Sequence, residues 1–103
     1  MKLPVPPTCI LYPDDVCSIG GIHALLELGK SIGKDISVAG YDGLFITTVL
    51  TPAVTTIIQD TDRIGREAAQ RLIQMIEDPK ATPIERIVIP GKLFPGDSIV
   101  DLR

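Results

Sequence analysis

Aromatic residues and cysteines are scarce in this sequence, which has no tryptophan, two phenylalanines, two tyrosines and two cysteines among 103 residues. A core filled by aromatic rings is therefore excluded, so the interior must be built from Ile, Leu, Val and Ala. Cys9 and Cys17 form no CxxC motif and have no clustered histidines as partners, which argues against a metal site. We expect both thiols to be small buried apolar side chains instead.

Positive charge is scarce as well, with 10 Lys and Arg against 13 Asp and Glu and a formal net charge of -3. A surface that binds nucleic acid needs clustered Lys and Arg to displace counterions from phosphates. The closest approach, Arg63, Arg66 and Arg71, is interleaved with acidic residues and is typical of a solvated helix face. We therefore expect neither direct DNA binding nor a DNA-binding domain within residues 1–103.

Long apolar runs and catalytic motifs are also missing. No run approaches the roughly 18 apolar residues of a membrane span, and prolines at the start interrupt the apolar helix that a secretory leader needs. The sequence has no glycine-rich phosphate loop, and its only histidine, His23, shows no pairing with a nearby Ser or Cys. We expect a soluble cytoplasmic protein that is not an enzyme, with no metal, no cofactor and no membrane partner.

What the sequence does contain is a series of short apolar runs that are typical of buried strands. We predict three main strands and two short C-terminal ones, at residues 8–12, 36–41, 54–58, 84–89 and 92–100. Two helices are predicted from apolar residues at helical spacing, one after Asp14 or Asp15 and one after Asp60 or Thr61. Residues 43–52 are expected to form a loop or short helix. This order predicts an α/β fold with a parallel sheet flanked by helices.

Acidic side chains directly follow two of the predicted strands. Asp14 and Asp15 come after the first strand, and Asp42 ends the second. Because open α/β sheets bind ligands at the carboxyl ends of their strands, Asp14 and Asp42 could face one crevice and accept hydrogen bonds from a sugar, polyol or nucleobase. Two alternatives stay open: helix capping by Asp14 or Asp15, and a turn at Asp42-Gly43.

Four motifs occur in an order and spacing that resemble one known family. They are an apolar strand leading into an acidic pair and a small-x-Gly helix (residues 10–20), the strand Ile36–Asp42, a Thr-Pro-x-x-Thr-Thr-Ile-x-Gln run (51–59) and a Gly-x-x-Ala helix (65–69). Together they resemble the effector-sensing domain of LacI/GalR-type transcriptional repressors, from Thr8 to about Val100. The resemblance implies part of one lobe of a periplasmic-binding-protein-like (type I) fold.

The resemblance also implies ligand-binding residues. Asp42 matches the acid that bonds the effector's hydroxyls or polar ring atoms in that family. Asp14 stands at the first position of an Asn-Asp pair that reaches the effector in sugar-binding members, so here an amide donor is replaced by a charge. Gln59 matches a glutamine that closes the third strand near the pocket. We predict Asp42, Asp14 and Gln59 as ligand contacts.

A homodimer formed through this lobe is a further implication of the resemblance. Ile19, Val49 and Leu50 map onto the family's dimer contact. Residues 43–52 carry several large apolar side chains, as such a contact would require. The alternative is that these side chains simply cover the end of the sheet.

In that family, a helix-turn-helix, a hinge helix and an N-terminal lobe come before the region that this sequence resembles. We therefore expect residues 1–103 to be a single partial domain, the C-terminal portion of an effector-binding and dimerisation domain. The helix matched by residues 60–77 packs on the N-terminal lobe in the family. We expect its apolar stripe to be covered here by a homodimer or by exchange of elements between chains. DNA would be contacted only through the absent helix-turn-helix domain.

Two other classes of protein compete with this interpretation. A sugar-transport periplasmic binding protein shares the two-lobe fold, but the Thr-Thr-Ile-x-Gln run and the acidic pair favour the repressor. The acids after two strands also resemble the receiver domain of response regulators, in which they hold Mg²⁺. That domain needs five βα units and a Lys after its last strand, whereas this sequence has two clear helices. The predicted function is therefore the sensing of a sugar or another small polar effector.

Overall fold

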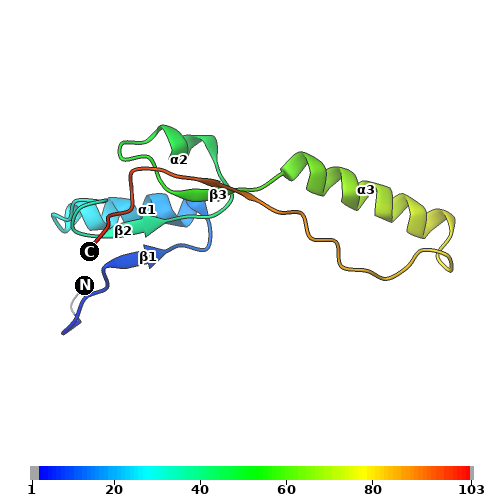
Figure 1. Cartoon of the computed structure of the whole chain (residues 1–103), viewed down its shortest axis with the longest axis horizontal. Helices are drawn as coiled ribbons and strands as arrows, with labels where there is room; N and C mark the ends of the chain where they lie inside the picture. Colours follow the sequence, from blue (N-terminus) through cyan, green and yellow to red (C-terminus); the bar gives the residue numbers. More distant parts are fainter. Residues whose placement is uncertain (1–2, 103) are drawn as a thin grey trace. The chain divides into compact units, whose positions relative to one another are not determined.

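The computed structural model describes residues 3–102 and divides into two compact units. Unit 1 comprises Met1–Ile58 and Lys92–Arg103, and unit 2 comprises Gln59–Gly91. Unit 1 contains β1 (Cys9–Leu11), α1 (Asp15–Glu27), β2 (Ser37–Ala39), α2 (Phe45–Val49), β3 (Thr56–Ile58) and β4 (Lys92–Phe94) (Figure 1). Unit 2 contains α3 (Thr61–Glu77) and the segment that follows it.

The strands of unit 1 confirm the predicted α/β fold. β1 pairs with β2 in parallel, with Ile10 opposite Val38, and α1 makes the crossover that parallel neighbours require. Two isolated parallel bridges connect the regions of β2 and β3. One joins Ala39, the last residue of β2, to Thr55, which comes just before β3. The other joins Asp42, which follows β2, to Ile58, the last residue of β3. β4 pairs with β3 in the antiparallel direction, so the last strand departs from the parallel order of the others.

Local hydrogen bonds define both ends of helix α1. Asp14 is the N-cap residue, and its side chain accepts a hydrogen bond from the backbone N–H of Cys17. At the other end the backbone N–H of Gly29, whose φ is +70°, donates to the carbonyl of Leu26. A glycine with positive φ just after a helix is a common stop signal. Both ends of the predicted helix are therefore confirmed.

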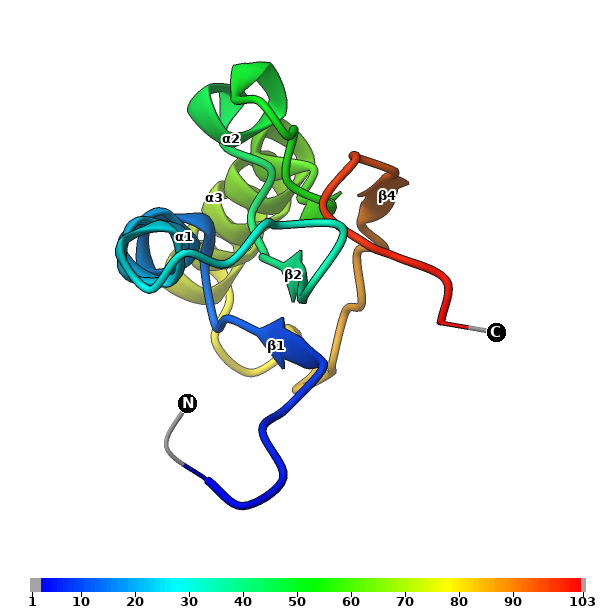
Figure 2. The ribbon, with the colours of Figure 1, turned by 90° about the vertical axis from the view of Figure 1, so that its left-hand side faces the viewer.

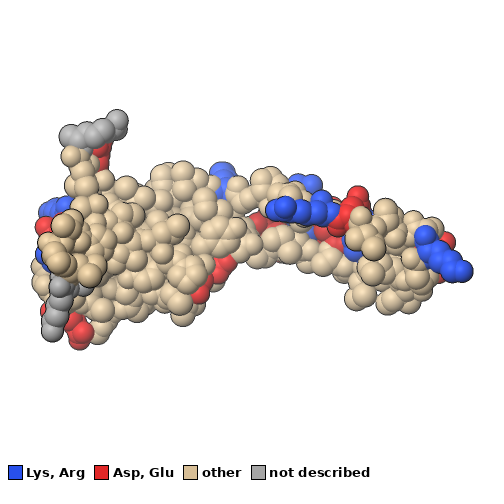
Figure 3. All heavy atoms as spheres, turned by 90° about the horizontal axis from the view of Figure 1, so that it is seen from below, with Lys and Arg blue, Asp and Glu red and all other residues tan. Residues whose placement is uncertain are grey.

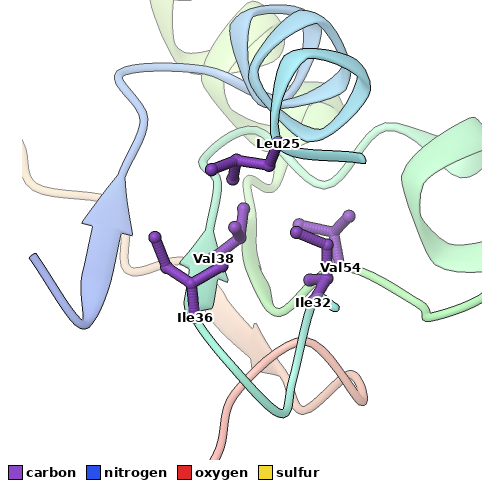
Figure 4. Packing of buried hydrophobic residues seen from close by; sticks show 5 residues of the cluster. All are labelled: Leu25, Ile32, Ile36, Val38 and Val54. Atoms are coloured by element: carbon purple, nitrogen blue, oxygen red, sulfur yellow. The ribbon is translucent and has the colours of Figure 1, made fainter. Parts of the chain in front are cut away.

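The core of unit 1 is aliphatic, as the scarcity of aromatic residues predicts. Leu25 of α1 packs toward Val38 of β2, and further buried residues come from the turn before β2 and the segment before β3 (Figure 4). The cluster consists of Leu25, Ile32, Ile36, Val38 and Val54. Because its members come from four separate stretches of the chain, this packing holds α1 against β1 and β2 (Figure 2).

The C-terminal segment after β4 is tied to the sheet mainly by Ser98, which is fully buried. The Ser98 hydroxyl donates to the carbonyl of Val38 at 2.6 Å and accepts from the backbone N–H of Thr55 at 2.8 Å. The backbone N–H of Val38 donates to the Ser98 carbonyl at 2.9 Å. The predicted strand over residues 92–100 is therefore shorter than expected, since only Lys92–Phe94 forms a ladder and the rest is held by these separate bonds.

The strand predicted over residues 84–89 is wrong. This segment has no ladder partner among the described residues and runs beside α3 instead (Figure 1). A strand exists only where a neighbour exchanges backbone hydrogen bonds with it. The apolar residues of this segment are typical of a strand, but they carry no information on whether a pairing strand is present.

The prediction that both cysteines are buried is also wrong, since Cys9 and Cys17 are exposed. In β1 only the middle residue, Ile10, is partly buried, while Cys9 and Leu11 are exposed. Side chains alternate between the faces of a strand, and α1 covers the face to which Ile10 belongs. Cys17 lies on the first turn of α1, where its thiol is bonded to Asp14 rather than packed in the core.

Unit 2 has an amphipathic helix with little cover. Asp60 caps α3 by accepting from the backbone N–H of Arg63, yet no residue of α3 is buried. A groove of about 600 Å³ lies between α3 and the returning segment, lined by apolar residues that include Ile64, Met75 and Ile87. Figure 3 shows basic and acidic side chains interspersed on part of the surface, with uncharged residues over most of the rest. Arg63 and Arg66 are exposed, as predicted for a solvated face, whereas Arg71 is partly buried, lines the groove and forms an ion pair with Glu85.

Candidate ligand-binding edge and dimer surface

Asp42 ends the β2 segment with an uncommon backbone conformation. Its φ is 107°, and the following Gly43 has φ +73°. A Cβ at Gly43 would lie 2.5 Å from the Cα of Ile58, so only glycine fits there. The backbone N–H of Asp42 donates to the carbonyl of Ile57 at 3.0 Å, which holds this turn against β3. A non-glycine residue held at positive φ costs about 1–3 kcal/mol, and such strain is concentrated at functional sites.

Asp14 follows β1 at the same edge of the sheet, because β1 and β2 are parallel neighbours. Its carboxylate accepts from the backbone N–H of Cys17 at 2.7 Å and from the Cys17 thiol at 3.2 Å. The backbone hydrogen bond and then the thiol hydrogen bond lower the pKa of Asp14 below its usual value. The same contact raises the pKa of the Cys17 thiol. Capping is thus what Asp14 does here, and its remaining lone pairs stay available to a ligand hydroxyl.

Asp15 is the acidic residue that sequence patterns did not single out as functional. Its side chain is fully buried and accepts three hydrogen bonds. One carboxylate oxygen accepts from the Thr56 hydroxyl of β3, and the other from the backbone N–H of Leu44 and the hydroxyl of Thr47 at α2. A Cβ at Gly40 would lie 2.3 Å from the first oxygen. One feature of the sequence could have indicated this role. Of two successive acids at the start of a helix, only one can be the N-cap residue, so the side chain of the other needs different hydrogen-bond partners.

The remaining predicted ligand residue, Gln59, follows β3 as Asp42 follows β2. It is partly buried and is the first residue of unit 2. Its predicted role as a ligand contact stays a prediction.

An aromatic feature of this edge was not predicted. Leu11, Tyr12, Pro13 and Tyr41 line a shallow depression of about 340 Å³ where β1 and β2 end. The Tyr41 ring is 43% exposed and belongs to the residue directly before Asp42. Aromatic rings next to acids present an apolar face beside hydrogen-bond acceptors, which is the composition typical of small-molecule sites.

The predicted dimer residues fall in two environments. Val49 is 54% exposed on α2, next to other exposed apolar side chains, among them Phe45 at 79%. Ile19 of α1 is partly buried, and Leu50 is partly buried against the core cluster. The exposed apolar face of α2 suits a contact with another protein. Leu50 instead packs against the core, in line with the alternative that the apolar side chains of residues 43–52 cover the end of the sheet.

Within residues 3–102, no group of three or more His, Cys, Asp or Glu is arranged to hold a metal ion. Nor does any helix of that part of the chain have the length and apolar character to cross a membrane.

The fold and this edge together define a class of protein. Parallel βα units that carry polar side chains at the carboxyl ends of their strands form the lobes of α/β proteins that bind small molecules. The acids of unit 1 stand at that position after β1 and β2.

Comparison with known proteins identifies the family. Residues 1–99 match the periplasmic binding protein-like domain. The chain belongs to this family and is part of the domain as LacI/GalR-type transcriptional regulators carry it. It is 30% identical over 99 residues to the probable transcriptional repressor ExuR of Bacillus subtilis, covering 96% of this chain and 29% of that protein. It is 35% identical over 95 residues to the repressor PurR of Yersinia enterocolitica, covering 92% and 28%.

Solved structures of regulators are similar as well. The lac repressor dimer bound to operator and an anti-inducer superposes with a TM-score of 0.80 at 29% identity, over 92% of this chain and 32% of that one. A LacI family regulator from Enterococcus faecium with bound ribose has the same TM-score and identity, over 93% and 36%. The relatives are transcriptional repressors, which confirms the prediction of a non-enzymatic protein. The chain spans less than a third of the length of these curated relatives.

Proposed function

We propose that the chain is the effector-sensing and dimerisation part of a LacI/GalR-type regulator that responds to a sugar or another small polar molecule. The observation that carries the proposal is Asp42, held in a strained turn by β3 at the carboxyl edge of the sheet. Strain of this kind is retained where a side chain has to be aimed. The ribose bound to the Enterococcus faecium relative supports a hydroxyl-rich ligand.

Asp42 and Asp14 would accept hydrogen bonds from ligand hydroxyls, with Gln59 as a weaker third contact. Hydrogen bonds to a charged acceptor are worth about 1.5–3 kcal/mol, roughly twice a neutral pair. Two carboxylates disfavour an anionic ligand. Tyr41 adds an apolar face on which a sugar ring or a nucleobase can lie.

Partners follow from the same proposal. The exposed apolar side chains of α2, with Val49 among them, and Ile19 of α1 would contact a second copy of the chain, with Leu50 at the border of core and interface. The lac repressor relative is a dimer bound to its operator. DNA would be contacted by a helix-turn-helix outside this region, and the regulator would act in the cytoplasm.

Unit 2 supports the proposal that the chain is one part of a larger domain. α3 buries none of its residues, and the groove beside it is largely apolar. In the proposed assembly this face is covered by further parts of the regulator or, for residues 1–103 alone, by elements exchanged with a second chain. Residues 1–103 would then be a single partial domain with half of the pocket.

The test is a thermal-shift screen of sugars and purines on the full-length regulator. At about 100 times Kd a ligand adds about 2.7 kcal/mol of stability, a rise of several degrees in Tm. Asp42→Asn should weaken that ligand about tenfold or more, because the charged acceptor is lost. Glu27→Gln removes the same charge at the far, exposed end of α1 and should leave binding unchanged.

Two outcomes would count against the proposal. One is full ligand binding by the Asp42→Asn variant. The other is micromolar binding by residues 1–103 alone, which would contradict a pocket whose other half lies outside this chain.

A further inference from the structure

The Asp15 carboxylate is a buried junction of three elements. It lies at the first position of α1, has no exposed surface, and both of its oxygens are used. Oδ1 accepts from the Thr56 hydroxyl at 2.7 Å, and Oδ2 accepts from the backbone N–H of Leu44 at 2.7 Å and the Thr47 hydroxyl at 2.9 Å. A buried carboxylate is tolerated only when hydrogen bonds of this kind replace the water that it loses.

Helix α2 depends on this junction for its first turn. It has five residues, and its N-cap residue, Leu44, has no side chain able to cap it. Asp15, from another element, instead accepts from the backbone N–H of Leu44 itself and so fixes the residue at which α2 starts. A helix this short is not stable by itself, so its position must be set by contacts from outside. Thr47, the one buried residue of α2, makes such a contact with Asp15.

Asp15 also sits between the residues that the proposed function uses. It directly follows Asp14, and the backbone N–H that it holds, that of Leu44, comes two residues after Asp42. α2, which begins directly after Leu44, carries the exposed apolar residues Phe45 and Val49. The Asp15 side chain therefore links the residue after Asp14 to the start of α2, close in the chain to Asp42.

We propose that Asp15 is a positioning residue that couples the ligand edge, formed by Asp14 and Asp42, to the dimer surface on α2. The inference rests on the proposed function, because that function assigns the two surfaces their roles. The proposal predicts an effect that a purely structural role of Asp15 does not predict. Loss of the Asp15 tether to α2 must change α2 and the Asp42 turn selectively, beyond its effect on overall stability.

The experiment compares Thr47→Val with Thr56→Val in the 103-residue chain. Each variant removes one hydroxyl from the same carboxylate at nearly constant volume, one on α2 and the other on β3. The Thr47 hydroxyl also contacts the Leu44 carbonyl at 2.7 Å, and Thr47→Val removes that contact as well, so the Asp42 and Gly43 amides must respond together with α2. Backbone amide hydrogen exchange is measured by NMR for residues 44–49 and for the core amides. Sedimentation equilibrium gives the dimer dissociation constant.

In Thr47→Val, exchange at residues 44–49 should rise about tenfold relative to the core amides, which corresponds to about 1.4 kcal/mol. The Asp42 and Gly43 amide shifts should move, and the dimer should weaken. Thr56→Val should lower stability without singling out α2. Thr47→Ser keeps the hydroxyl and should exchange as the wild type does.

Equal effects of the two valine variants on α2, or none from either, would overturn the proposal. So would complete unfolding of Thr47→Val with Thr56→Val still folded, since Thr47 would then serve global stability. A wild-type chain that stays monomeric contradicts the proposed dimer surface. In that case the exchange data still decide whether Asp15 positions α2 and the Asp42 turn.

Discussion

At the scale of single residues, two neighbouring acids of identical chemistry have opposite environments. Asp14 is a partly buried helix cap whose pKa is lowered, while Asp15 is fully buried and joins three elements. The difference arises because Asp14 stands before the first helical residue, where its carboxylate can turn back onto the Cys17 N–H. Asp15 is one step further along the helix, and its side chain is directed toward β3 and α2.

A pH titration tests the environment of Asp14. Its pKa is lowered from 3.8, so its stabilising contribution is complete above pH 3.8 and is lost as the pH falls through the lower folded value. Asp14→Asn still caps the helix but does not titrate. The stability advantage of the wild type over this variant, measured by urea unfolding from pH 6 to pH 2, should therefore shrink below pH 4. A difference that stays constant over this range would show that Asp14 does not titrate with a lowered pKa.

At the scale of elements, each part of unit 1 is positioned by hydrogen bonds that come from elsewhere in the sequence. α2 is held by Asp15 through the Leu44 N–H and the Thr47 hydroxyl. The segment after β4 is held by Ser98, which bonds to Val38 of β2 and to Thr55 just before β3. Short elements cannot hold themselves in place. The three-residue strands and the five-residue helix of this fold rely on such contacts.

Replacing Ser98 should loosen the sheet. Ser98→Ala removes the acceptor for the Thr55 N–H and a donor to the Val38 carbonyl, both buried. Leaving buried groups without a partner costs about 1–3 kcal/mol. Urea unfolding should show this loss, with faster amide exchange at Thr55. Asp97→Asn, an exposed neighbour, serves as the control and should stay within about 0.5 kcal/mol of the wild type.

At the scale of the whole molecule, the two units differ in how much apolar surface they bury. Unit 1 has a closed aliphatic cluster, whereas no residue of α3 in unit 2 is buried. A helix that exposes Leu72, Ile76 and other apolar side chains needs a covering surface. The chain also spans less than a third of its curated relatives. Both observations fit a part of a larger assembly.

Self-association is the prediction that belongs to this scale. Val49→Asp places a charge on the exposed face of α2 without opening the core, so it should raise the dimer dissociation constant by at least tenfold in sedimentation equilibrium. Leu93→Asp introduces the same charge at an exposed apolar residue of β4 and should leave the dimer intact. A wild-type monomer with a cooperative melting transition would contradict both the α2 contact and the exchange of elements between chains.

Much of the fold could be predicted from local sequence alone. The strand before Asp14, the helix that Asp14 caps and Gly29 stops, and the order of βα units all follow from patterns within a few residues of each other. The acids at the strand ends were located in the same way, since a parallel sheet places the carboxyl ends of neighbouring strands at one edge.

Tertiary structure alone decided the rest, because it depends on partners that are distant in sequence. Residues 84–89 have a strand-like pattern and no strand to pair with, and Cys9 is exposed because it points away from the face that α1 covers. In the sequence, Asp15 cannot be distinguished from Asp14. Only the tertiary structure brings Leu44, Thr47 and Thr56 within hydrogen-bond distance of Asp15. Local patterns determine which elements form, and the buried polar contacts between those elements determine the environment of each acid at the sheet edge.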